Sequence, residues 1–362
     1  MAMATLVGME TLDLNRFSSL VLRNKRTLKN RVVVPPMASG TAGAMGEVTE
    51  KTIEHYAKLA RSGAGLIIAE YTNVHGSGRS EENQLSAATD LDIAGLARLR
   101  STLQDGGALA GLQLTHGGGK SNLSLTDGNL MGPSGITVPV KDETLETPRG
   151  MNRDDIELWK NSFIAAARRA TLAGFDLIEF HSAHGYGLNQ FLSPLTNRRT
   201  DEYGGSLLNR SRLLREIIHL VRAEQPAMLI SVRIPGQDFL EAGLSTDEMI
   251  EIALMLEALG VDMIHVSSGI GGWRRPTTRV GEGYLVKEAA EIQARLSIPV
   301  IGVGGIETAE YIDQSLRERK FSLAAVGRAI LRGPELWRAE NLWQAGDSLD
   351  GGVSSLLRTV CH

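Results

Sequence analysis

Cysteine is nearly absent from this sequence, since Cys361 is the single cysteine among 362 residues. One cysteine excludes an internal disulfide framework, a zinc site built from cysteines and an iron–sulfur cluster held by cysteines. No apolar run approaches the roughly 20 residues that a membrane-spanning helix needs. The first residues lack a basic segment followed by an apolar core, so no secretory signal is predicted. We therefore expect a cytoplasmic protein.

An excess of charge of one sign is also missing. The chain has 38 Lys and Arg against 42 Asp and Glu, a net charge of −4. This balance does not favour nucleic acid or an anionic membrane as the main partner. No Pro/Ser-rich linker, short repeat or low-complexity segment divides the chain, so we expect one domain over residues 1–362. Glycine, in contrast, is abundant, and several of the 40 glycines follow predicted strands, where tight turns or a bound ligand require them.

Apolar strand patterns alternate with amphipathic helix patterns eight times along the chain. The predicted strands are residues 31–35, 65–69, 108–114, 176–180, 228–234, 263–266, 299–303 and 323–326. The predicted helices are residues 49–61, 91–103, 153–172, 206–222, 246–259, 285–296, 308–316 and 335–344. This alternation predicts an α/β fold with a parallel sheet covered by helices, and eight units predict a closed (β/α)₈ TIM barrel.

Two features flank the first predicted strand. Short β-rich runs between residues 19 and 34 predict an N-terminal β-hairpin that caps the bottom of the barrel. An open, doubly wound sheet is the competing architecture, but it usually places a glycine-rich turn after its first strand. Here that turn is Pro35-Pro36-Met37, which favours the barrel.

The most informative stretch is residues 181–210, directly after the fourth strand. It begins with His181, His184 and Tyr186 and continues into what its polar residues predict to be a long loop. Active sites of such barrels lie at the C-terminal ends of the strands. The histidines could donate hydrogen bonds to a substrate oxygen that gains negative charge, and Tyr186 could donate a proton. Each residue could instead be structural, but their clustering favours function; a metal site is disfavoured because no third ligand has a suitable spacing.

Two further groups lie at other strand ends. The turns GVGGIET and VGRAI follow strands seven and eight, where TIM barrels commonly bind phosphate. Arg328 could add a charge-assisted contact to that phosphate. Gln113 and Arg233 could bind the polar edge of a flat heterocycle. The alternatives are tight turns for the glycines and a buried ion pair for Arg233.

Several segments together resemble the old yellow enzyme family of flavin-dependent ene-reductases, over nearly the whole chain. They are LKNRVVVPPM, GLQLTHGGG, residues 181–210, IGVGGIET and VGRAI. The resemblance implies a TIM barrel that binds FMN without a covalent link. It implies that Pro35, Pro36 and Met37 lie against the flavin ring, that Gln113 and Arg233 hold its pyrimidine side, and that Gly304, Gly305, Gly327 and Arg328 surround its phosphate.

The same resemblance implies a reaction. His181 and His184 would hold the carbonyl of an α,β-unsaturated small molecule, reduced flavin N5 would deliver hydride to the β-carbon, and Tyr186 would protonate the α-carbon. NADPH or NADH would reduce the flavin first, in ping-pong turnover, and relatives often form homo-oligomers. This chain departs from the family pattern at Ala38, where relatives often carry Cys or Thr, and at Tyr71, where a small residue is usual.

Three alternatives remain at this point. The first is an FMN-dependent amine dehydrogenase or demethylase on the same barrel. The second is a flavin-free barrel lyase or isomerase that acts on a phosphate-bearing ligand. The third is a non-enzymatic flavin-binding protein in which the cluster at residues 181–186 is structural.

Overall fold

Eight parallel strands close into a barrel in the computed structural model, which describes residues 14–140, 144–273 and 275–337. The strands are β3 (Val32–Val34), β4 (Leu66–Asn73), β5 (Leu109–Thr115), β8 (Leu177–His181), β9 (Leu229–Pro235), β10 (Met263–Ser267), β11 (Val300–Gly302) and β12 (Leu323–Ala325). Each strand pairs with the next, and β12 pairs with β3 to close the ring. The predicted TIM barrel is confirmed.

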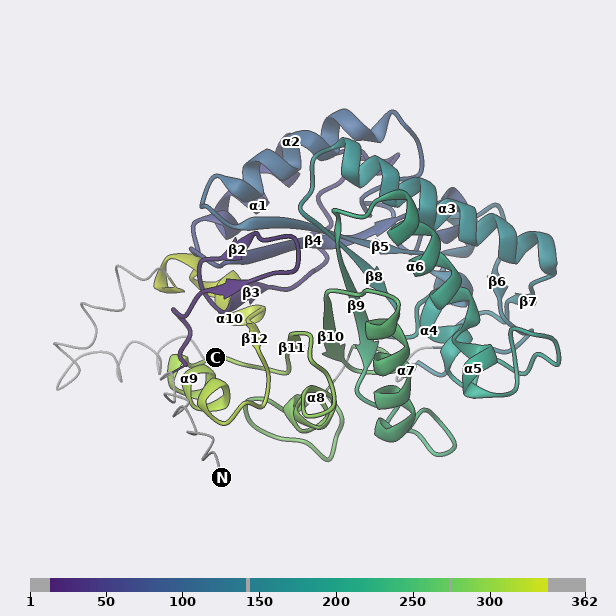
Figure 1. The fold of residues 1–362 in the computed structure, drawn as a ribbon. Helices are drawn as coiled ribbons and strands as arrows, with labels where there is room; N and C mark the ends of the chain where they lie inside the picture. The colour runs from purple at the N-terminus through teal and green to yellow at the C-terminus, as the bar shows by residue number, and fades with distance from the viewer. Residues whose placement is uncertain (1–13, 141–143, 274, 338–362) are drawn as a thin grey trace, which may run out of the picture.

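Helices surround the barrel on the outside, as Figure 1 shows. The longer ones are α1 (Glu50–Ala60), α2 (Asp92–Gln104), α3 (Arg153–Leu172), α6 (Arg212–Glu224), α7 (Thr246–Ala258), α8 (Val286–Gln293) and α9 (Ala309–Arg317). Thr49, Asn152 and Ser245 form capping boxes that fix where α1, α3 and α7 begin. Loops carry the short elements η1 (Gly76–Gly78), η2 (Gly118–Lys120), η3 (Leu123–Leu125), α4 (Gly187–Leu192), α5 (Leu207–Arg210), α10 (Arg328–Arg332) and η4 (Pro334–Trp337), and the two-stranded sheet of β6 (Met131–Gly132) and β7 (Arg149–Gly150).

Three predicted segments differ from the structure. The helix predicted at 206–222 is divided at Ser211 into α5 and α6. After β12 the chain forms α10, which Gly333 ends, and then the 3₁₀ turn η4, whereas we predicted a helix at 335–344. Residues 338–344 and Cys361 lie outside the described residues. The polar stretch after β8 contains the buried helix α4 rather than only a loop.

The N-terminal hairpin closes the bottom of the barrel, as predicted. It consists of β1 (Leu20–Val21) and β2 (Thr27–Leu28), which pair antiparallel. Leu22 and Leu28 pack in one apolar cluster with inward-facing residues of the strands, namely Val33, Leu66, Ile68, Leu177, Leu229, Met263, Ile301, Leu323 and Ala325. Arg23 and Arg26 form ion pairs with Asp262 and Asp176, which precede β10 and β8. The floor of the barrel is therefore an apolar plug tied down at its rim.

Above this floor the barrel interior becomes polar. Side chains of a strand alternate between inside and outside, so every second residue of β8, β9 and β10 faces inward. The lowest positions are Leu177, Leu229 and Met263. A middle layer follows, formed by Glu179, Ser231 and His265, all fully buried. His181, Arg233 and Ser267 form the top layer, so the interior changes from apolar to ionisable within five residues of β8.

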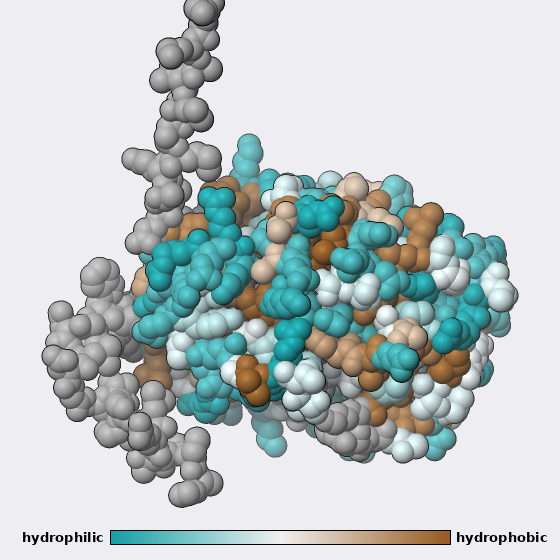
Figure 2. Space-filling model, turned by 90° about the horizontal axis from the view of Figure 1, so that it is seen from below, coloured by the Kyte–Doolittle hydropathy of each residue, from teal (hydrophilic) through white to brown (hydrophobic). Residues whose placement is uncertain are grey.

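The outer surface gives no indication of membrane insertion through helices. Among residues 14–140, 144–273 and 275–337, no helix has the length and apolar character to cross a bilayer. Figure 2 shows one face of the molecule, on which hydrophobic residues are dispersed among hydrophilic ones.

Candidate active site

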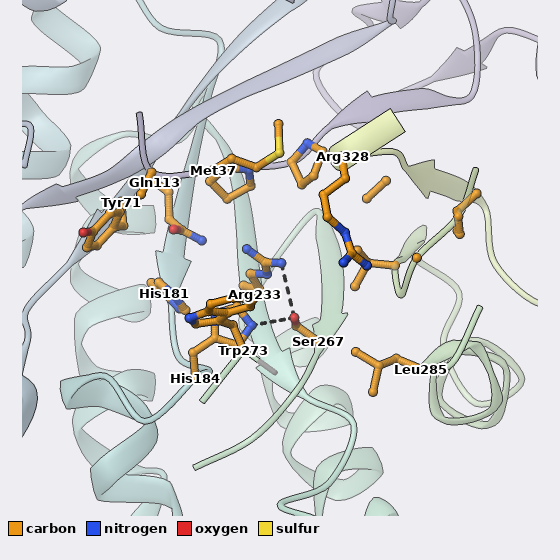
Figure 3. Close-up of a pocket in the computed structure, with 18 of the residues that line it drawn as sticks. Met37, Tyr71, Gln113, His181, His184, Arg233, Ser267, Trp273, Leu285 and Arg328 are labelled. Carbon is orange, nitrogen blue, oxygen red and sulfur yellow. Dashed lines mark hydrogen bonds between the residues drawn. The ribbon is translucent and has the colours of Figure 1, made fainter. Parts of the chain in front are cut away.

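A cavity of about 550 Å³ lies at the C-terminal ends of the strands. This volume falls within the range of small-molecule sites. Its lining includes nearly all of the predicted site residues: Pro35, Pro36, Met37, Gln113, His181, His184, Tyr186, Arg233, Gly305, Gly327 and Arg328. Figure 3 shows Tyr71, Gln113 and the two histidines on one side and Arg328 on the other. The remaining predicted residue, Gly304, does not line the cavity but supports it through its backbone.

His184 lies in a strained turn after β8. Its φ of 58° is left-handed, a conformation that costs a non-glycine residue on the order of 1–3 kcal/mol. Three interactions hold it there. Its backbone N–H donates to the Ser268 carbonyl at 3.2 Å, its carbonyl accepts from Lys120 Nζ at 3.0 Å, and its Nε2 lies 2.7 Å from Ser267 Oγ. The structure therefore enforces one position of this imidazole.

The protonation states of the two histidines follow from their surroundings. Burial, together with the positive charge of Arg233, holds the pKa of both His181 and His184 well below the ordinary value of 6.5, so both are neutral near pH 7. His181 Nδ1 accepts from the Ala183 N–H, which leaves the proton on Nε2. Ser267 Oγ accepts from Arg233 Nη2 at 3.2 Å and can donate its own hydrogen to His184 Nε2, 2.7 Å away; in that arrangement the proton of His184 lies on Nδ1.

In these tautomers each imidazole keeps one N–H that no described residue accepts. The ring centroids of His181 and His184 are 5.0 Å apart, and the rings are nearly perpendicular. Two neutral N–H donors at this separation can converge on one acceptor atom, such as a carbonyl oxygen.

Tyr186 stands beside this pair, with its ring 4.7 Å from that of His181. Lys120 Nζ lies 4.5 Å from the centroid of the Tyr186 ring. The tyrosine begins α4, and buried amides of α4 fix the turn that precedes it. Asn189 Oδ1 accepts from the Gly185 N–H at 2.8 Å, and Gln190 Nε2 donates to the Gly185 carbonyl at 2.7 Å. The polar residues that suggested a solvated loop are therefore the scaffold of the site.

Gln113 and Arg233 face the cavity from β5 and β9. Gln113 Nε2 donates to Glu179 at 2.9 Å, and its Oε1 accepts no hydrogen bond from the described residues. Arg233 has five N–H donors, of which the described residues accept one, and its Nε is buried without a partner. A fixed cation with unused donors and an open carbonyl oxygen can bind the donor and acceptor edge of a heterocycle.

The opposite end of the cavity is shaped by glycines. A Cβ at Gly327 would lie 3.1 Å from Met37 Sδ, and Gly305 has a φ of 66° that favours glycine. Gly304, behind them, has a φ of 126°, and a Cβ there would lie 2.8 Å from the Leu285 nitrogen. Arg328 makes no hydrogen bond or ion pair with the described residues. Glycine backbone leaves room for a phosphate, and the guanidinium of Arg328 is available to pair with it.

These two ends fit FMN. The cofactor has a flat ring with a polar pyrimidine edge and a phosphate at the other end of its side chain. Arg233 and Gln113 supply the matching groups for the edge, and Arg328 supplies the charge for the phosphate. Pro35, Pro36 and Met37 supply an apolar wall between them.

Two features of the cavity were not assigned a role from the sequence. Tyr71 enters the lining because β4 contains a β-bulge: the register shifts between Ala69 and Thr72, so two residues of β4 oppose one residue of β5. The Tyr71 ring lies 5.6 Å from that of Tyr186. Trp273, on the loop after β10, also lines the cavity and is 67% exposed, so it forms part of the rim.

The chain is similar to known proteins over most of its length. Residues 17–341 match the NADH:flavin oxidoreductase / NADH oxidase family. An NADPH dehydrogenase from Geobacillus sp. (strain WCH70) is 39% identical over 338 residues, which cover 93% of this chain and 96% of that protein. The old yellow enzyme homologue from Zymomonas mobilis shares the fold, with a TM-score of 0.78 at 24% identity, over 91% of this chain and 92% of that one. Histamine dehydrogenase from Rhizobium sp. 4-9 is 27% identical with a TM-score of 0.81, over 92% of this chain and 48% of that one.

Proposed function

Because the chain belongs to the NADH:flavin oxidoreductase / NADH oxidase family, which includes the old yellow enzymes, we propose that it reduces the C=C bond of α,β-unsaturated carbonyl compounds. The chain is an oxidoreductase with FMN as its cofactor and NADPH or NADH as its reductant. This excludes the flavin-free lyase or isomerase considered from the sequence. The observation that carries the proposal is the pair of neutral imidazole donors, His181 and His184, beside the phenol of Tyr186.

The cofactor would be held by the groups at the two ends of the cavity. Gln113 and Arg233 would bind its pyrimidine edge, while Gly305, Gly327 and Arg328 would surround its phosphate, with Gly304 shaping the turn. Pro35, Pro36 and Met37 would lie against the ring. When bound and reduced, FMN supplies hydride.

The histidines would bind the substrate carbonyl. Hydride addition at the β-carbon places negative charge on the carbonyl oxygen, and the N–H groups of His181 and His184 would stabilise it. Neutral imidazoles suit this role because their protons stay in place as donors. Loss of one such donor commonly costs a factor of about 10²–10³ in rate.

Tyr186 would complete the reaction by donating its phenolic proton to the α-carbon. Its ring lies near both His181 and Lys120, close to the place where the carbonyl would be held. The positive charge of Lys120 would offset the negative charge left on the phenolic oxygen.

The double variant His181→Ala/His184→Ala tests the proposal. We expect turnover of cyclohexenone with NADPH to fall by more than about 10²-fold, because both donors are lost. Visible absorption of bound FMN, and its bleaching by NADPH without oxygen, should persist. Undiminished enone turnover in a variant that keeps FMN would contradict the assigned role.

Tyr186→Phe tests proton donation separately. Stopped-flow measurement should show a slower reoxidation of the reduced enzyme by enone, with little change in flavin reduction by NADPH. Equal slowing of both half-reactions would argue against proton donation by Tyr186.

Oxidation of an amine is a second candidate function. The faces of aromatic rings attract ammonium groups, and the rings of Tyr71 and Trp273 line the cavity. The likeness to histamine dehydrogenase points the same way. Against it, Lys120 and Arg275 bring positive charge to the same cavity. Anaerobic mixing distinguishes the two, since bleaching of the flavin by histamine rather than by NADPH would favour amine oxidation.

A further inference from the structure

The middle layer of the barrel interior is an ionisable cluster that lies beneath the site cavity and is not part of its lining. Glu179 and His265 are both 0% exposed, directly beneath the top layer. The Glu179 carboxylate accepts three hydrogen bonds: from Gln113 Nε2 at 2.9 Å, from Ser231 Oγ at 2.8 Å and from His265 Nδ1 at 3.0 Å. Burying a carboxylate costs stability unless its oxygens accept hydrogen bonds, and these three donors meet that need.

Glu179 carries a negative charge inside the barrel. Burial opposes ionisation, but the charge and the hydrogen bond of His265, together with the charge of Arg233, hold the pKa of its carboxyl below the ordinary value. Burial lowers the pKa of His265 against the opposing effect of the Glu179 charge, and its Nδ1 donates to the carboxylate. The negative charge of Glu179 therefore partly offsets the positive charge of Arg233, which is the next inward-facing residue of β9 above Ser231.

The same carboxylate fixes the amide of Gln113. An ionised carboxylate only accepts hydrogen bonds, so the NH₂ group of Gln113 must turn toward it. This leaves Gln113 Oε1 without a partner among the described residues. The ring system of oxidised flavin has a single N–H, at N3, which is the one group of its pyrimidine edge that could donate to this oxygen.

We propose that Glu179 is a positioning residue for the flavin: it turns the carbonyl of Gln113 toward the cavity and offsets the charge of Arg233. The inference rests on the proposed FMN site but not on the identity of the substrate. Electrons added to the flavin are stabilised by Arg233 and opposed by Glu179. Glu179 should thus lower the midpoint potential of the bound flavin.

The variant Glu179→Gln tests this on the FMN-loaded protein. Glutamine has the shape of glutamate and keeps one oxygen for Ser231 and His265, but it lacks the charge and turns an NH₂ group, which cannot accept, toward Gln113 Nε2. We expect the ratio of the dissociation constants of oxidised and reduced FMN to rise about tenfold, which equals an increase of about 30 mV in the two-electron midpoint potential. The potential is measured by equilibration with a reference dye, without any alkene.

Two matched variants separate charge from structure. Glu179→Asp keeps the charge and should leave the potential near that of the wild type, even where FMN binds more weakly. Ser231→Ala removes one hydrogen bond to Glu179 without changing any charge and should also leave it near that value. An unchanged potential in Glu179→Gln, or the same rise in Glu179→Asp, would overturn the proposal.

A measurement on the wild-type protein covers the case in which Glu179→Gln does not fold. FMN methylated at N3 cannot donate to Gln113 Oε1 and should bind at least about tenfold more weakly than FMN. Equal affinity for both would refute the inferred orientation of Gln113. A wild type that binds FMN in this manner but does not reduce enones would overturn the proposed reaction and leave the role of Glu179 intact.

Discussion

The two ends of the barrel are built on different principles. At the bottom, Leu22 and Leu28 complete an apolar cluster, and the nearby charges are paired. At the top, His184 holds a left-handed conformation, and Arg233 keeps a buried nitrogen without a partner. Strain and unsatisfied polar groups cost stability wherever they occur, and they gather where a ligand is to be bound. Stable packing at the bottom thus offsets the cost of the strained and unsatisfied groups that form the site at the top.

A substitution at the bottom of the barrel tests most directly whether the two ends are independent. Leu28 is 0% exposed, and Leu28→Ala removes its side chain from the plug. We expect a loss of about 3 kcal/mol in the free energy of unfolding, measured by urea denaturation, because the cavity left behind adds to the lost burial. The affinity for FMN should stay within about twofold of wild type, since the plug and the cofactor site lie at opposite ends.

Val21→Ala is the matched control, in the same hairpin. Val21 is 68% exposed, so its truncation should change stability by less than about 0.5 kcal/mol. A large loss of FMN affinity in Leu28→Ala at temperatures where the protein remains folded would show that the two ends are not independent.

The sequence predicts the strands, the helices and the end of the barrel that carries the site. Period-two and helical patterns located the strands and helices, and the C-terminal ends of parallel strands must meet at one end of a barrel. His181, Arg233 and Arg328 could therefore be grouped although they are far apart in the chain. The resemblance to a known family supplied the roles that these patterns could not assign.

The remaining features depend on register and on buried polar contacts. The contact of Glu179 with His265 requires the stagger of β8, β9 and β10, which no single strand reveals. Tyr71 would face outward with Ala69 under strict alternation, and only the bulge turns it inward. The polar residues Asn189 and Gln190 predict a loop where α4 lies, although both are fully buried.

A substitution at the top should weaken FMN binding and leave the stability of the fold unchanged, the opposite of Leu28→Ala. Arg328 forms no ion pair with the described residues, so Arg328→Ala should change the free energy of unfolding by less than about 0.5 kcal/mol. A charge-assisted contact to a phosphate contributes about 2 kcal/mol, so FMN should bind about 10- to 100-fold more weakly. Riboflavin, which lacks the phosphate, should bind as it does to wild type, as measured by fluorescence titration.

Arg332→Ala is the matched control, one turn further along α10. Arg332 pairs with Glu307, and its side chain is 59% exposed. It should leave binding of both flavins unchanged. If Arg328→Ala weakened riboflavin as much as FMN, the arginine would contact the ring end of the cofactor and not its phosphate.

The smallest expected effect is a dependence of stability on pH that originates at the top. His116 follows β5, stacks on Trp159 with ring centroids 4.0 Å apart, and accepts a hydrogen bond from the Gly118 N–H. Burial, with a smaller contribution from His75, lowers the pKa of His116 from 6.5 to about 3. Below pH 6.5 the imidazole of His116 therefore binds a proton in the unfolded chain but not in the folded chain, so its contribution to stability is fully present above this pH and falls as the pH decreases toward 3.

Between pH 7.5 and 5.5 we expect His116 to lower the free energy of unfolding by about 1.4 kcal/mol. His116→Gln, which keeps an acceptor for Gly118, should lose that much less stability than wild type between these two pH values in urea denaturation. An equal pH dependence in His116→Gln and wild type would mean that the pKa of His116 does not differ between the folded and the unfolded chain.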